Sequence, residues 1–337
     1  MMIVLTGGGT GGHLAIVRCL LESVQRKNIT CIYIGSQNGQ DKAWFEKETR
    51  FKDKFFLSSQ GVVNQSKFNK INSFLHILKL SKECRQIFKD YKVKAVISVG
   101  GYSAAPASFG ALFSGIPLFI HEQNSKSGSL NKLLKPFSKK FFSSFEEDFT
   151  PYPVADKFFN HARIRKELKN IIFLGGSQGA TFINELAIQL APILNEKNIN
   201  IIHQCGKNDL EKYKQIYQNL NIKADVFDFS PNLEEKMYMA DLAISRAGAS
   251  TLFELCANAL PAIFIPYPYA AKNHQYFNAK FLQDQNLCQI FTQNSADADE
   301  ILKTILNTNL ESLSKGLQDI IKKNGSDILL EKILKLI

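Results

Sequence analysis

The chain opens with the stretch that decides its fold, Ile3-Val4-Leu5-Thr6-Gly7-Gly8-Gly9-Thr10-Gly11-Gly12. A second stretch of the same kind begins about halfway along, at Ile171-Ile172-Phe173-Leu174-Gly175-Gly176-Ser177-Gln178-Gly179-Ala180. In both, a short apolar run passes into glycines and then into a helix-length segment. This is the order of a strand, a turn that a phosphate can approach, and a helix N-terminus. Two such openings predict an α/β protein with two Rossmann-like domains in tandem.

The rest of the chain repeats this alternation of short apolar runs and longer amphipathic segments. Such alternation favours parallel sheets with helices on both faces. We expect strands at residues 3–6, 31–34, 95–99, 118–121, 171–174, 199–203, 225–229, 242–244 and 262–265. We expect helices at residues 15–25, 73–89, 182–194, 251–259 and 319–337.

The domain boundary is predicted at Thr150-Pro151-Tyr152-Pro153, where two prolines set a rigid turn. A chain of 337 residues also exceeds what one hydrophobic core usually organises. We therefore expect an N-terminal domain at residues 1–155, a C-terminal domain at 156–318 and a separate terminal helix. Ligands bind at the carboxyl ends of parallel strands, so the two sheets are expected to face a central cleft that holds the active site.

Charge and cysteine usage narrow the class of protein. A formal net charge of +10 favours an anionic partner, such as nucleic acid, acidic lipid or a phosphorylated substrate, although a lysine-rich proteome would produce the same surplus. The six cysteines form no CxxC pair, which suits reduced thiols in the cytosol rather than a zinc site or a disulfide scaffold. The N-terminus lacks the basic region of a signal peptide.

Residues 95–121 contain no Asp, Glu, Lys or Arg, which raises the question of a membrane span. A span needs about 20 consecutive apolar residues, whereas this stretch is broken by glycines and prolines. We expect a strand, a glycine loop, a helix of small residues and a second strand, all buried in protein.

The first glycine loop suits an anionic ligand, because glycines let the backbone approach it and the next helix offers unpaired N–H groups. The segment Gly35-Ser36-Gln37-Asn38 carries no acidic residue for a ribose, which argues against NAD, and no P-loop follows. His13 ends the loop at the helix start, where the dipole favours a neutral imidazole that can take a proton from a hydroxyl. The alternative is a histidine that only caps or packs the helix.

Five motifs occur in an order that resembles the MurG family of UDP-N-acetylglucosamine transferases. They are residues 8–13 (GGTGGH), 100–102 (GGY), 121–124 (HEQN), 175–179 (GGSQG) and 246–251 (RAGAST), and the resemblance extends to about residue 279. It implies a GT-B fold with His13 as the catalytic base. It also implies inverting transfer of N-acetylglucosamine from UDP-N-acetylglucosamine to the C4 hydroxyl of the muramyl sugar of lipid I, forming lipid II for peptidoglycan synthesis. Neither a metal nor another cofactor is expected.

The resemblance also implies individual roles. Donor-binding residues would be Thr10, Gly11, Gly12, Asn124, Ser177, Ser230, Ala249, Ser250, Thr251, Leu252, Phe253, Glu254 and Gln275. Among these, Glu254 would hold the ribose hydroxyls, Gln275 the sugar hydroxyls and the Ser230 backbone the uracil edge. Gly100, Gly101, Tyr102 and His121 would lie on the acceptor side. The segment 319–337 would pack back on the first domain.

The chain departs from the family pattern in two places. An arginine that the family places near the donor phosphates is replaced by Ala155, so Lys157, Arg163 and Arg165 are candidates for the missing cation. The stretch after His13 lacks the proline that the family commonly has there, which could alter the start of the helix.

Eight basic residues between positions 67 and 94 are interleaved with apolar ones, and residues 135–142 (KPFSKKFF) form a second basic cluster. Cations around exposed apolar side chains suit an anionic membrane surface. We expect Lys67, Phe68, Lys70 and Ile71 to face the membrane, on the cytoplasmic face of the inner membrane where a peripheral enzyme would meet lipid I. The alternative is a core-facing apolar stripe with solvated lysines.

Three other functions remain open. The chain could be another GT-B transferase acting on a lipid-linked or glycoside acceptor, or a UDP-N-acetylglucosamine epimerase, although no good pair of acid and base carboxylates is visible. It could also be a non-catalytic subunit that binds a nucleotide sugar and recruits partners to the membrane. A nucleic-acid partner is disfavoured, because no recognised binding module surrounds the basic stretch.

Overall fold

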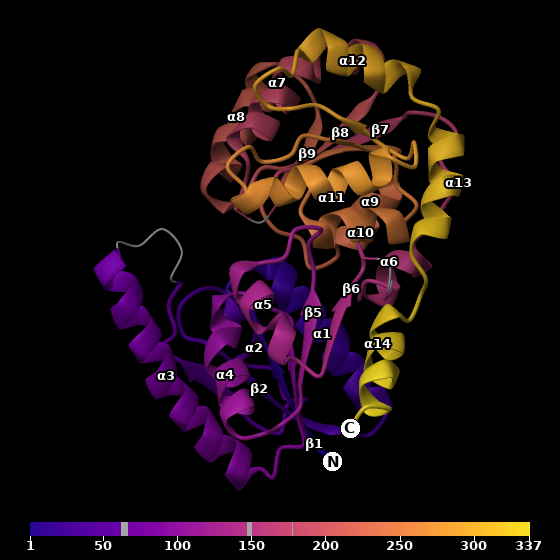
Figure 1. Ribbon diagram of the computed structural model, residues 1–337. Helices are drawn as coiled ribbons and strands as arrows, with labels where there is room; N and C mark the ends of the chain where they lie inside the picture. Colours follow the sequence, from indigo (N-terminus) through magenta and orange to yellow (C-terminus); the bar gives the residue numbers. More distant parts are fainter. Residues whose placement is uncertain (62–66, 147–149, 177) are drawn as a thin grey trace. The chain divides into compact units, whose positions relative to one another are not determined.

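The computed structural model describes residues 1–61, 67–146, 150–176 and 178–337, with the side chains of residues 67–71 left aside. The chain forms two compact units, traced in Figure 1. Unit 1 comprises Met1–Val154 and Asn324–Ile337, and unit 2 comprises Ala155–Lys323. The division falls directly after the two prolines at the predicted boundary.

Unit 1 is built on a parallel sheet of six strands in the order β3-β2-β1-β4-β5-β6. The strands are β1 (Met2–Thr6), β2 (Thr30–Ser36), β3 (Lys54–Leu57), β4 (Ala95–Ser98), β5 (Leu118–Glu122) and β6 (Lys140–Ser143). The sequence predicted β1, β2, β4 and β5 but not the two edge strands. Both edge strands begin with a lysine, and we had read β6 as part of a basic membrane cluster. Phe142 in β6 is instead 2% exposed and belongs to the core.

The unit 1 helices are α1 (Gly11–Arg26), α2 (Asp41–Phe45), α3 (Lys67–Asp90), η1 (Tyr102–Ala104), α4 (Ala105–Phe113), α5 (Ser129–Leu134), η2 (Lys135–Phe137) and α14 (Gly325–Leu334). The uncharged stretch forms β4, η1, α4 and β5 in that order, as predicted. Small residues let α4 lie close to α3, since a Cβ on Gly110 would come within 2.9 Å of Cys84. None of the described helices has the length and apolar character to cross a membrane.

Unit 2 repeats the design with a parallel sheet in the order β12-β11-β10-β7-β8-β9. Its strands are β7 (Asn170–Leu174), β8 (Asn200–Gln204), β9 (Ala224–Phe227), β10 (Leu242–Ser245), β11 (Ala262–Phe264) and β12 (Gln289–Ile290). Its helices are α6 (Asp156–Asn160), α7 (Thr181–Glu196), η3 (Lys207–Asp209), α8 (Leu210–Asn219), α9 (Leu233–Met239), α10 (Ala249–Ala257), η4 (Ala271–Asn273), α11 (His274–Gln283), α12 (Ala298–Asn307) and α13 (Leu310–Ile320). The two apolar runs that lead into glycines, residues 3–6 and 171–174, form β1 and β7. Each is the third strand from one edge of its sheet. The predicted restart of the fold is therefore confirmed.

The expected terminal helix at residues 319–337 is broken in the structure. Helix α13 ends at Ile320, and α14 begins only after Asn324, which adopts a left-handed conformation with φ 65°. Helix α14 then packs on α1, where the hydroxyls of Ser23 and Ser326 lie 2.8 Å apart in a buried contact. The last helix is thus part of the first unit.

Candidate active site

The first glycine loop joins β1 to α1 and is held from below by a buried carboxylate. Asp41 is fully buried, and its Oδ2 accepts the Gly9 N–H at 2.6 Å. Its Oδ1 accepts the Ser36 N–H and lies 3.0 Å from the Tyr33 hydroxyl. A Cβ on Gly8 would collide with the same carboxylate, so this position of the loop requires glycine. Because the Gly9 N–H already donates to Asp41, it is not available to a ligand anion. The backbone N–H groups at the start of α1 are the groups that can bind one.

Sequence reasoning missed Asp41. The segment of residues 35–38 carries no acidic residue, but the chain turns after β2 and brings Asp41, the first residue of α2, under the loop. A buried charge accepting two backbone N–H groups is a structural anchor, not a ribose ligand. No helix was predicted at this position, so nothing in the sequence indicated the role of Asp41.

His13 lies in the first turn of α1 and contacts two other predicted motifs. Its Nδ1 lies 2.9 Å from the Thr10 Oγ1, so Thr10 bonds the histidine instead of capping the helix with its side chain. Its Nε2 lies 2.9 Å from Nε2 of Gln123, which follows β5 in the His-Glu-Gln-Asn run. The structure therefore brings the first glycine loop and this run together at the carboxyl edge of the unit 1 sheet.

The His-Glu-Gln-Asn turn is shaped by a second buried carboxylate, Glu122. One oxygen accepts the Asn124 N–H at 3.0 Å, and the other accepts the Gly128 N–H at 3.0 Å and the Asn131 amide at 2.9 Å. Asn131 in turn packs against Gly100, where a Cβ would come within 2.8 Å of its side chain. Glu122 and Asn131 had no role in the sequence reading, because their contacts appear only once the strand ends meet.

The structure corrects the role expected for His121. We expected it on a loop facing the acceptor, but it lies in β5, is fully buried and faces the ring of Tyr152 at 5.7 Å. Burial and, to a smaller extent, nearby His13 lower the pKa of His121 to about 3. It is a buried, neutral histidine in the core of unit 1.

Tyr102 lies beside the glycine loops as expected, but its hydroxyl is engaged. It donates to the Asn38 carbonyl, and the ring fills the space where a Cβ on Gly9 would stand. Burial raises the pKa of the Tyr102 hydroxyl, so it stays protonated. The contacts make it a support for the loop. Gly100 and Gly101 both have positive φ, 88° and 79°, and close the other side of the loop.

In unit 2 the predicted donor residues gather at the start of α10. Gly248 precedes the helix and supplies no side-chain cap, so the first turn at Ala249, Ser250 and Thr251 is the part that can meet a diphosphate. Leu252 and Phe253 are a correction to our expectation. Both are fully buried, and the Leu252 N–H donates to the Gly248 carbonyl within the helix. Their side chains hold α10 in the core.

Glu254 completes the second turn of α10. Although part of the residue is accessible to solvent, protein surrounds the carboxyl, and this burial raises the pKa of Glu254 to about 7. The charge of Lys157 opposes the shift and that of Glu234 adds to it. Lys157 itself lies 2.6 Å from the Glu234 carboxylate and donates to the Pro231 carbonyl at 2.7 Å, next to Ser230. This lysine therefore ties the Ser230 turn to α9, and its charge acts electrostatically on Glu254 of α10.

Gln275, near the start of α11, is fixed in one orientation. Its Oε1 accepts the Ala247 N–H at 3.2 Å and the Tyr267 N–H at 2.9 Å. Because the oxygen is used in this way, the amide nitrogen is the group left to meet a ligand, and it can only donate. A sugar hydroxyl would accept from it.

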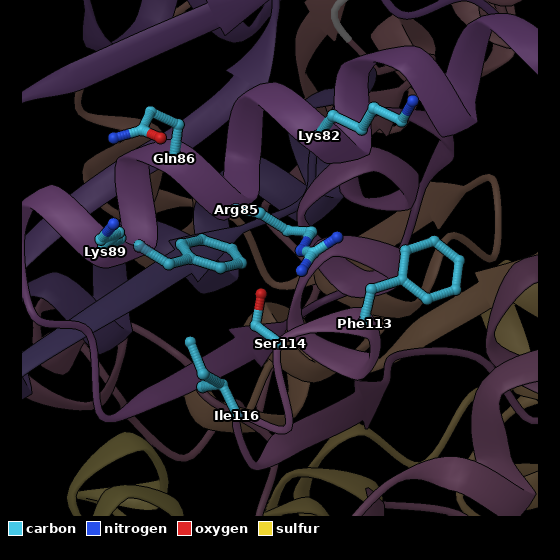
Figure 2. Close-up of a pocket in the computed structure, with 8 residues that line it drawn as sticks. Lys82, Arg85, Gln86, Lys89, Phe113, Ser114 and Ile116 are labelled. Atoms are coloured by element: carbon cyan, nitrogen blue, oxygen red, sulfur yellow. The ribbon is translucent and has the colours of Figure 1, made fainter.

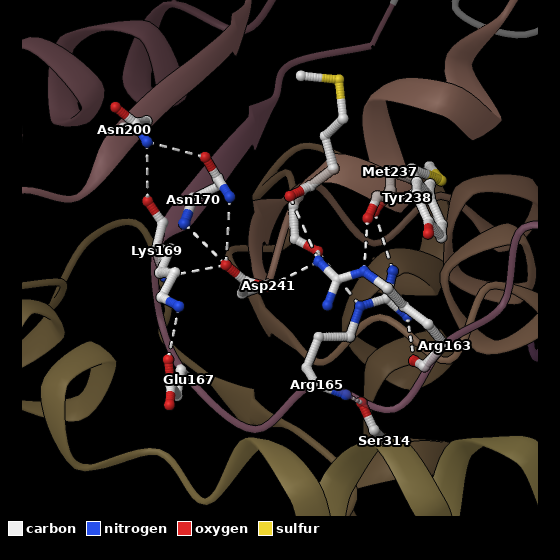
Figure 3. A network of polar contacts seen from close by, with 12 residues as sticks. Arg163, Arg165, Glu167, Lys169, Asn170, Asn200, Met237, Tyr238, Asp241 and Ser314 are labelled. Atoms are coloured by element: carbon white, nitrogen blue, oxygen red, sulfur yellow. Dashed lines mark hydrogen bonds and ion pairs between the residues drawn. The ribbon is translucent and has the colours of Figure 1, made fainter.

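Two of the three candidates for the missing cation have structural roles instead. As Figure 3 shows, Arg163 forms an ion pair with Asp241 at 2.6 Å, and Arg165 is a buried guanidinium. Arg165 donates to the carbonyls of Met237, Ala240 and Asn258. These contacts tie the entry of unit 2 to β10 and α9. Lys157 is the candidate whose charge reaches the donor residues.

Some predicted residues lie outside what the structure describes. Ser177 is one, and the side chains of Lys67, Phe68, Lys70 and Ile71 are others, although all four belong to α3. Beside Ser177, Gly179 has φ 78° and packs so tightly on Cys205 that no Cβ fits. In the part of the chain that is described, no three His, Cys, Asp or Glu side chains are grouped as a metal site.

Comparisons with known proteins agree with this arrangement. Residues 3–143 match the glycosyltransferase family 28 N-terminal domain, and residues 170–328 match the glycosyltransferase family 28 C-terminal domain. MurG of Acinetobacter baumannii has a TM-score of 0.78 to this chain, at 26% identity over 99% of both chains. A UDP-GlcNAc 2-epimerase from Neisseria meningitidis scores 0.63 at 12% identity over 99% of both chains, which is a likeness of fold alone. The predicted GT-B fold class is confirmed, and the central cleft stays a prediction.

Relatives at high identity identify the family. A protein of Campylobacter jejuni (strain RM1221) named UDP-N-acetylglucosamine--N-acetylmuramyl-(pentapeptide) pyrophosphoryl-undecaprenol N-acetylglucosamine transferase is 78% identical over 99% of this chain and 98% of its own length. A protein of the same name from Wolinella succinogenes is 52% identical over 99% of this chain and 100% of its own length. The chain therefore belongs to the MurG family of N-acetylglucosamine transferases.

Proposed function

We propose that this enzyme transfers N-acetylglucosamine from UDP-N-acetylglucosamine to the C4 hydroxyl of the muramyl sugar of lipid I, forming lipid II. Family membership supplies the donor and the acceptor. The observation that carries the chemistry is the position of His13, which stands at the start of α1 between Thr10 and Gln123. A neutral imidazole there can take the proton of an attacking hydroxyl.

Unit 2 supplies the donor site in this proposal. Glu254 accepts the two ribose hydroxyls, the Ser230 backbone meets the uracil edge, and Gln275 donates to a sugar hydroxyl. Asn124 of unit 1 reaches the donor sugar. The Ser177 loop and the first turn of α10 bind the diphosphate through backbone N–H groups.

The transfer is a single inverting displacement. The acceptor oxygen forms a bond to the sugar's anomeric carbon, the bond from that carbon to the phosphate oxygen breaks, and UDP leaves with the electron pair. Helix N-termini and backbone amides stabilise the charge that develops on the diphosphate. Lys157, through its place beside Glu234 and Pro231, supplies a cation on this side of the site in the absence of the family arginine.

We further propose that unit 1 binds an anionic inner-membrane surface at its cytoplasmic face. Helices α3 and α4 border a pocket of about 620 Å³, lined by Lys82, Arg85, Gln86, Phe88, Lys89, Phe113, Ser114 and Ile116. Figure 2 shows Lys82, Arg85 and Lys89 on one helix, with Arg85 directed toward Phe113 and Ser114. Phe74, Leu75 and Phe113 are 45–58% exposed, so apolar groups accompany the charges. This combination suits lipid head groups with adjoining acyl chains.

The alternative activities differ in donor, acceptor or product. A panel of UDP-sugars tested against a lipid I analogue and against other glycoside acceptors separates them. We expect turnover with UDP-N-acetylglucosamine and lipid I, and a new β linkage seen in the proton coupling of the product. Conversion of UDP-N-acetylglucosamine without an acceptor would indicate an epimerase. UDP binding with no product from any pair would favour the non-catalytic subunit.

A further inference from the structure

Gln123 contacts His13 but has no role in the proposed reaction. We propose that Gln123 is a positioning residue for the base: it fixes the tautomer of His13, and the acceptor hydroxyl inserts between the two side chains. This inference rests on the proposed function and adds a residue to it.

The tautomer follows from which atoms face each other. An amide nitrogen can only donate a hydrogen bond, so the Gln123 Nε2 at 2.9 Å requires a lone pair on Nε2 of His13. The proton of the neutral imidazole then lies on Nδ1 and is donated to the Thr10 Oγ1 at 2.9 Å. Thr10 and Gln123 together hold the ring with its basic nitrogen directed at the carboxamide.

The other end of the carboxamide is not anchored. Gln123 is 7% exposed, and within the described part of the chain its Oε1 is a buried oxygen without a hydrogen-bond partner. Buried amide oxygens are nearly always satisfied, so a donor is missing from this position. A hydroxyl or amide N–H of the bound sugar has the chemistry to supply it. The orphaned oxygen is the sign that a polar ligand belongs beside Gln123.

Insertion keeps every hydrogen bond balanced. The acceptor hydroxyl donates its proton to Nε2 of His13 and accepts the N–H that Gln123 had given to that nitrogen. In the reaction the hydroxyl oxygen bonds to the anomeric carbon, its proton moves to Nε2, and UDP departs with the electron pair of the broken bond. Gln123 thus aims a lone pair of the nucleophile without exchanging a proton itself.

The tautomer can be tested without turnover. The chain has six histidines, so the ¹⁵N imidazole signals of His13 can be assigned by their loss in His13→Ala. We expect an unprotonated Nε2 in the wild type. Gln123→Met preserves the size of the side chain but not its hydrogen bonds, and it should shift His13 towards the tautomer with its proton on Nε2. Gln25→Met is the control, since Gln25 is an exposed residue whose amide donates only to the Arg50 carbonyl at 3.0 Å.

Kinetics with a lipid I analogue provide the second readout. We expect Gln123→Met to lower kcat about 10- to 100-fold, with an unchanged KM for UDP-N-acetylglucosamine. The variant misdirects the base without removing it, whereas loss of a general base costs about 100- to 10,000-fold. Gln123→Glu has the same shape but accepts instead of donating, so it should move the acidic limb of the rate profile upward by about one pH unit. Among the described residues, His121 is a titratable group whose pKa is influenced by His13, and it remains unchanged in these variants.

The outcomes separate this inference from the proposed function. An unchanged His13 tautomer in Gln123→Met, or a kcat within twofold of the wild type, overturns the role of Gln123 even if lipid II forms normally. A wild type that makes no lipid II overturns the proposed function, while the NMR result still decides whether Gln123 sets the tautomer.

Discussion

At the scale of single residues, three buried or partly buried carboxylates serve different purposes. Asp41 and Glu122 each accept backbone N–H groups through both carboxylate oxygens. Both side chains therefore fix the conformation of a loop. Glu254 lies near Lys157, but burial outweighs that charge and raises the pKa of its carboxyl to about 7. A carboxyl that titrates near neutrality and lies beside a helix start is suited to binding a ligand.

This shift predicts a pH-dependent affinity for the nucleoside. Below about pH 7 Glu254 is protonated and loses an acceptor for the ribose, so uridine binding should weaken as the pH falls from 8 to 6. Glu254→Gln should weaken binding about 10- to 100-fold at pH 8, since a charged hydrogen bond contributes roughly 1.5–3 kcal/mol, and should remove the pH dependence. Isothermal titration with uridine measures this without interference from phosphate ionisation.

The stability of the same variant provides the control. The folded-state pKa of Glu254 lies above its ordinary value of 4.5, so its contribution to stability is full below pH 4.5 and is lost as the pH rises through about 7. Glu254→Gln should therefore unfold at pH 8 at a temperature no lower than the wild type. Weaker binding together with a lower Tm would mean that the residue supports the fold instead.

At the scale of elements, helix α3 combines a core face with a basic outer face. Cys84 and Phe88 are buried in the core next to Gly110 of α4, whereas Lys82, Arg85 and Lys89 are exposed around the pocket. The sequence reading treated the membrane face and the core stripe as alternatives for this segment. In the described part of the helix a core face and an exposed basic face are both present, and they adjoin at the pocket.

Removing the three charges should reduce membrane binding. The triple variant of Lys82, Arg85 and Lys89 to Gln should bind phosphatidylglycerol vesicles about 100-fold more weakly, since each basic residue near the surface contributes about 1 kcal/mol. Sedimentation with vesicles of that lipid measures the loss, and phosphatidylcholine vesicles give the baseline. The matched control changes Lys207, Lys212 and Lys223 of unit 2, which are also exposed. Equal losses in both variants would mean that only net charge matters.

The elements that the sequence predicted are those with strong local patterns. Central strands such as β1 and β7 are apolar throughout and lead into glycines, so they were found, as was the small-residue helix α4. Edge strands β3 and β6 bury fewer side chains and begin with lysine, so their patterns are weak. The two-residue strand β12 is too short to show a pattern at all.

The site shows the same division. His13 ends a motif that can be read along the chain, and the family resemblance extends past its last motif to Glu254 and Gln275. Asp41 and Gln123 could not be predicted, because their roles arise from contacts across 32 and 110 residues of sequence. His121 was misread for the related reason that the burial of a strand end depends on its neighbours in the sheet.

At the scale of the whole molecule, the two ends of the chain belong to the same unit. Helix α14 belongs to unit 1 and buries Leu329, Leu330 and Ile333 completely, while Arg26 and Asp327 form an ion pair on the surface at 2.9 Å. The N-terminal unit therefore needs the last residues of the chain to complete its core. A chain truncated before α14 would expose the side of α1 on which this helix packs.

This closure predicts unequal effects of two substitutions in one helix. Leu330→Ala should destabilise unit 1 by about 2–5 kcal/mol through a core cavity, whereas Asp327→Ala should cost less than about 1 kcal/mol. The sole tryptophan, Trp44, lies in unit 1, so its fluorescence during urea unfolding reports on that unit. A loss from Leu330→Ala no larger than that from Asp327→Ala would contradict a role for α14 in the core.

The central claim is that this chain makes lipid II with His13 as its base. The direct measurement is transfer of radiolabelled N-acetylglucosamine from its UDP donor to a soluble lipid I analogue, with EDTA present, by the wild type, His13→Ala and the control His76→Ala. His76 lies on the exposed face of α3 and contacts only Ser58 among the hydrogen bonds described. We predict EDTA-resistant transfer by the wild type and the control, and a fall of at least 100-fold in His13→Ala with UDP binding retained. Transfer by His13→Ala at the control rate, or none by a folded wild type that binds UDP, would contradict the account.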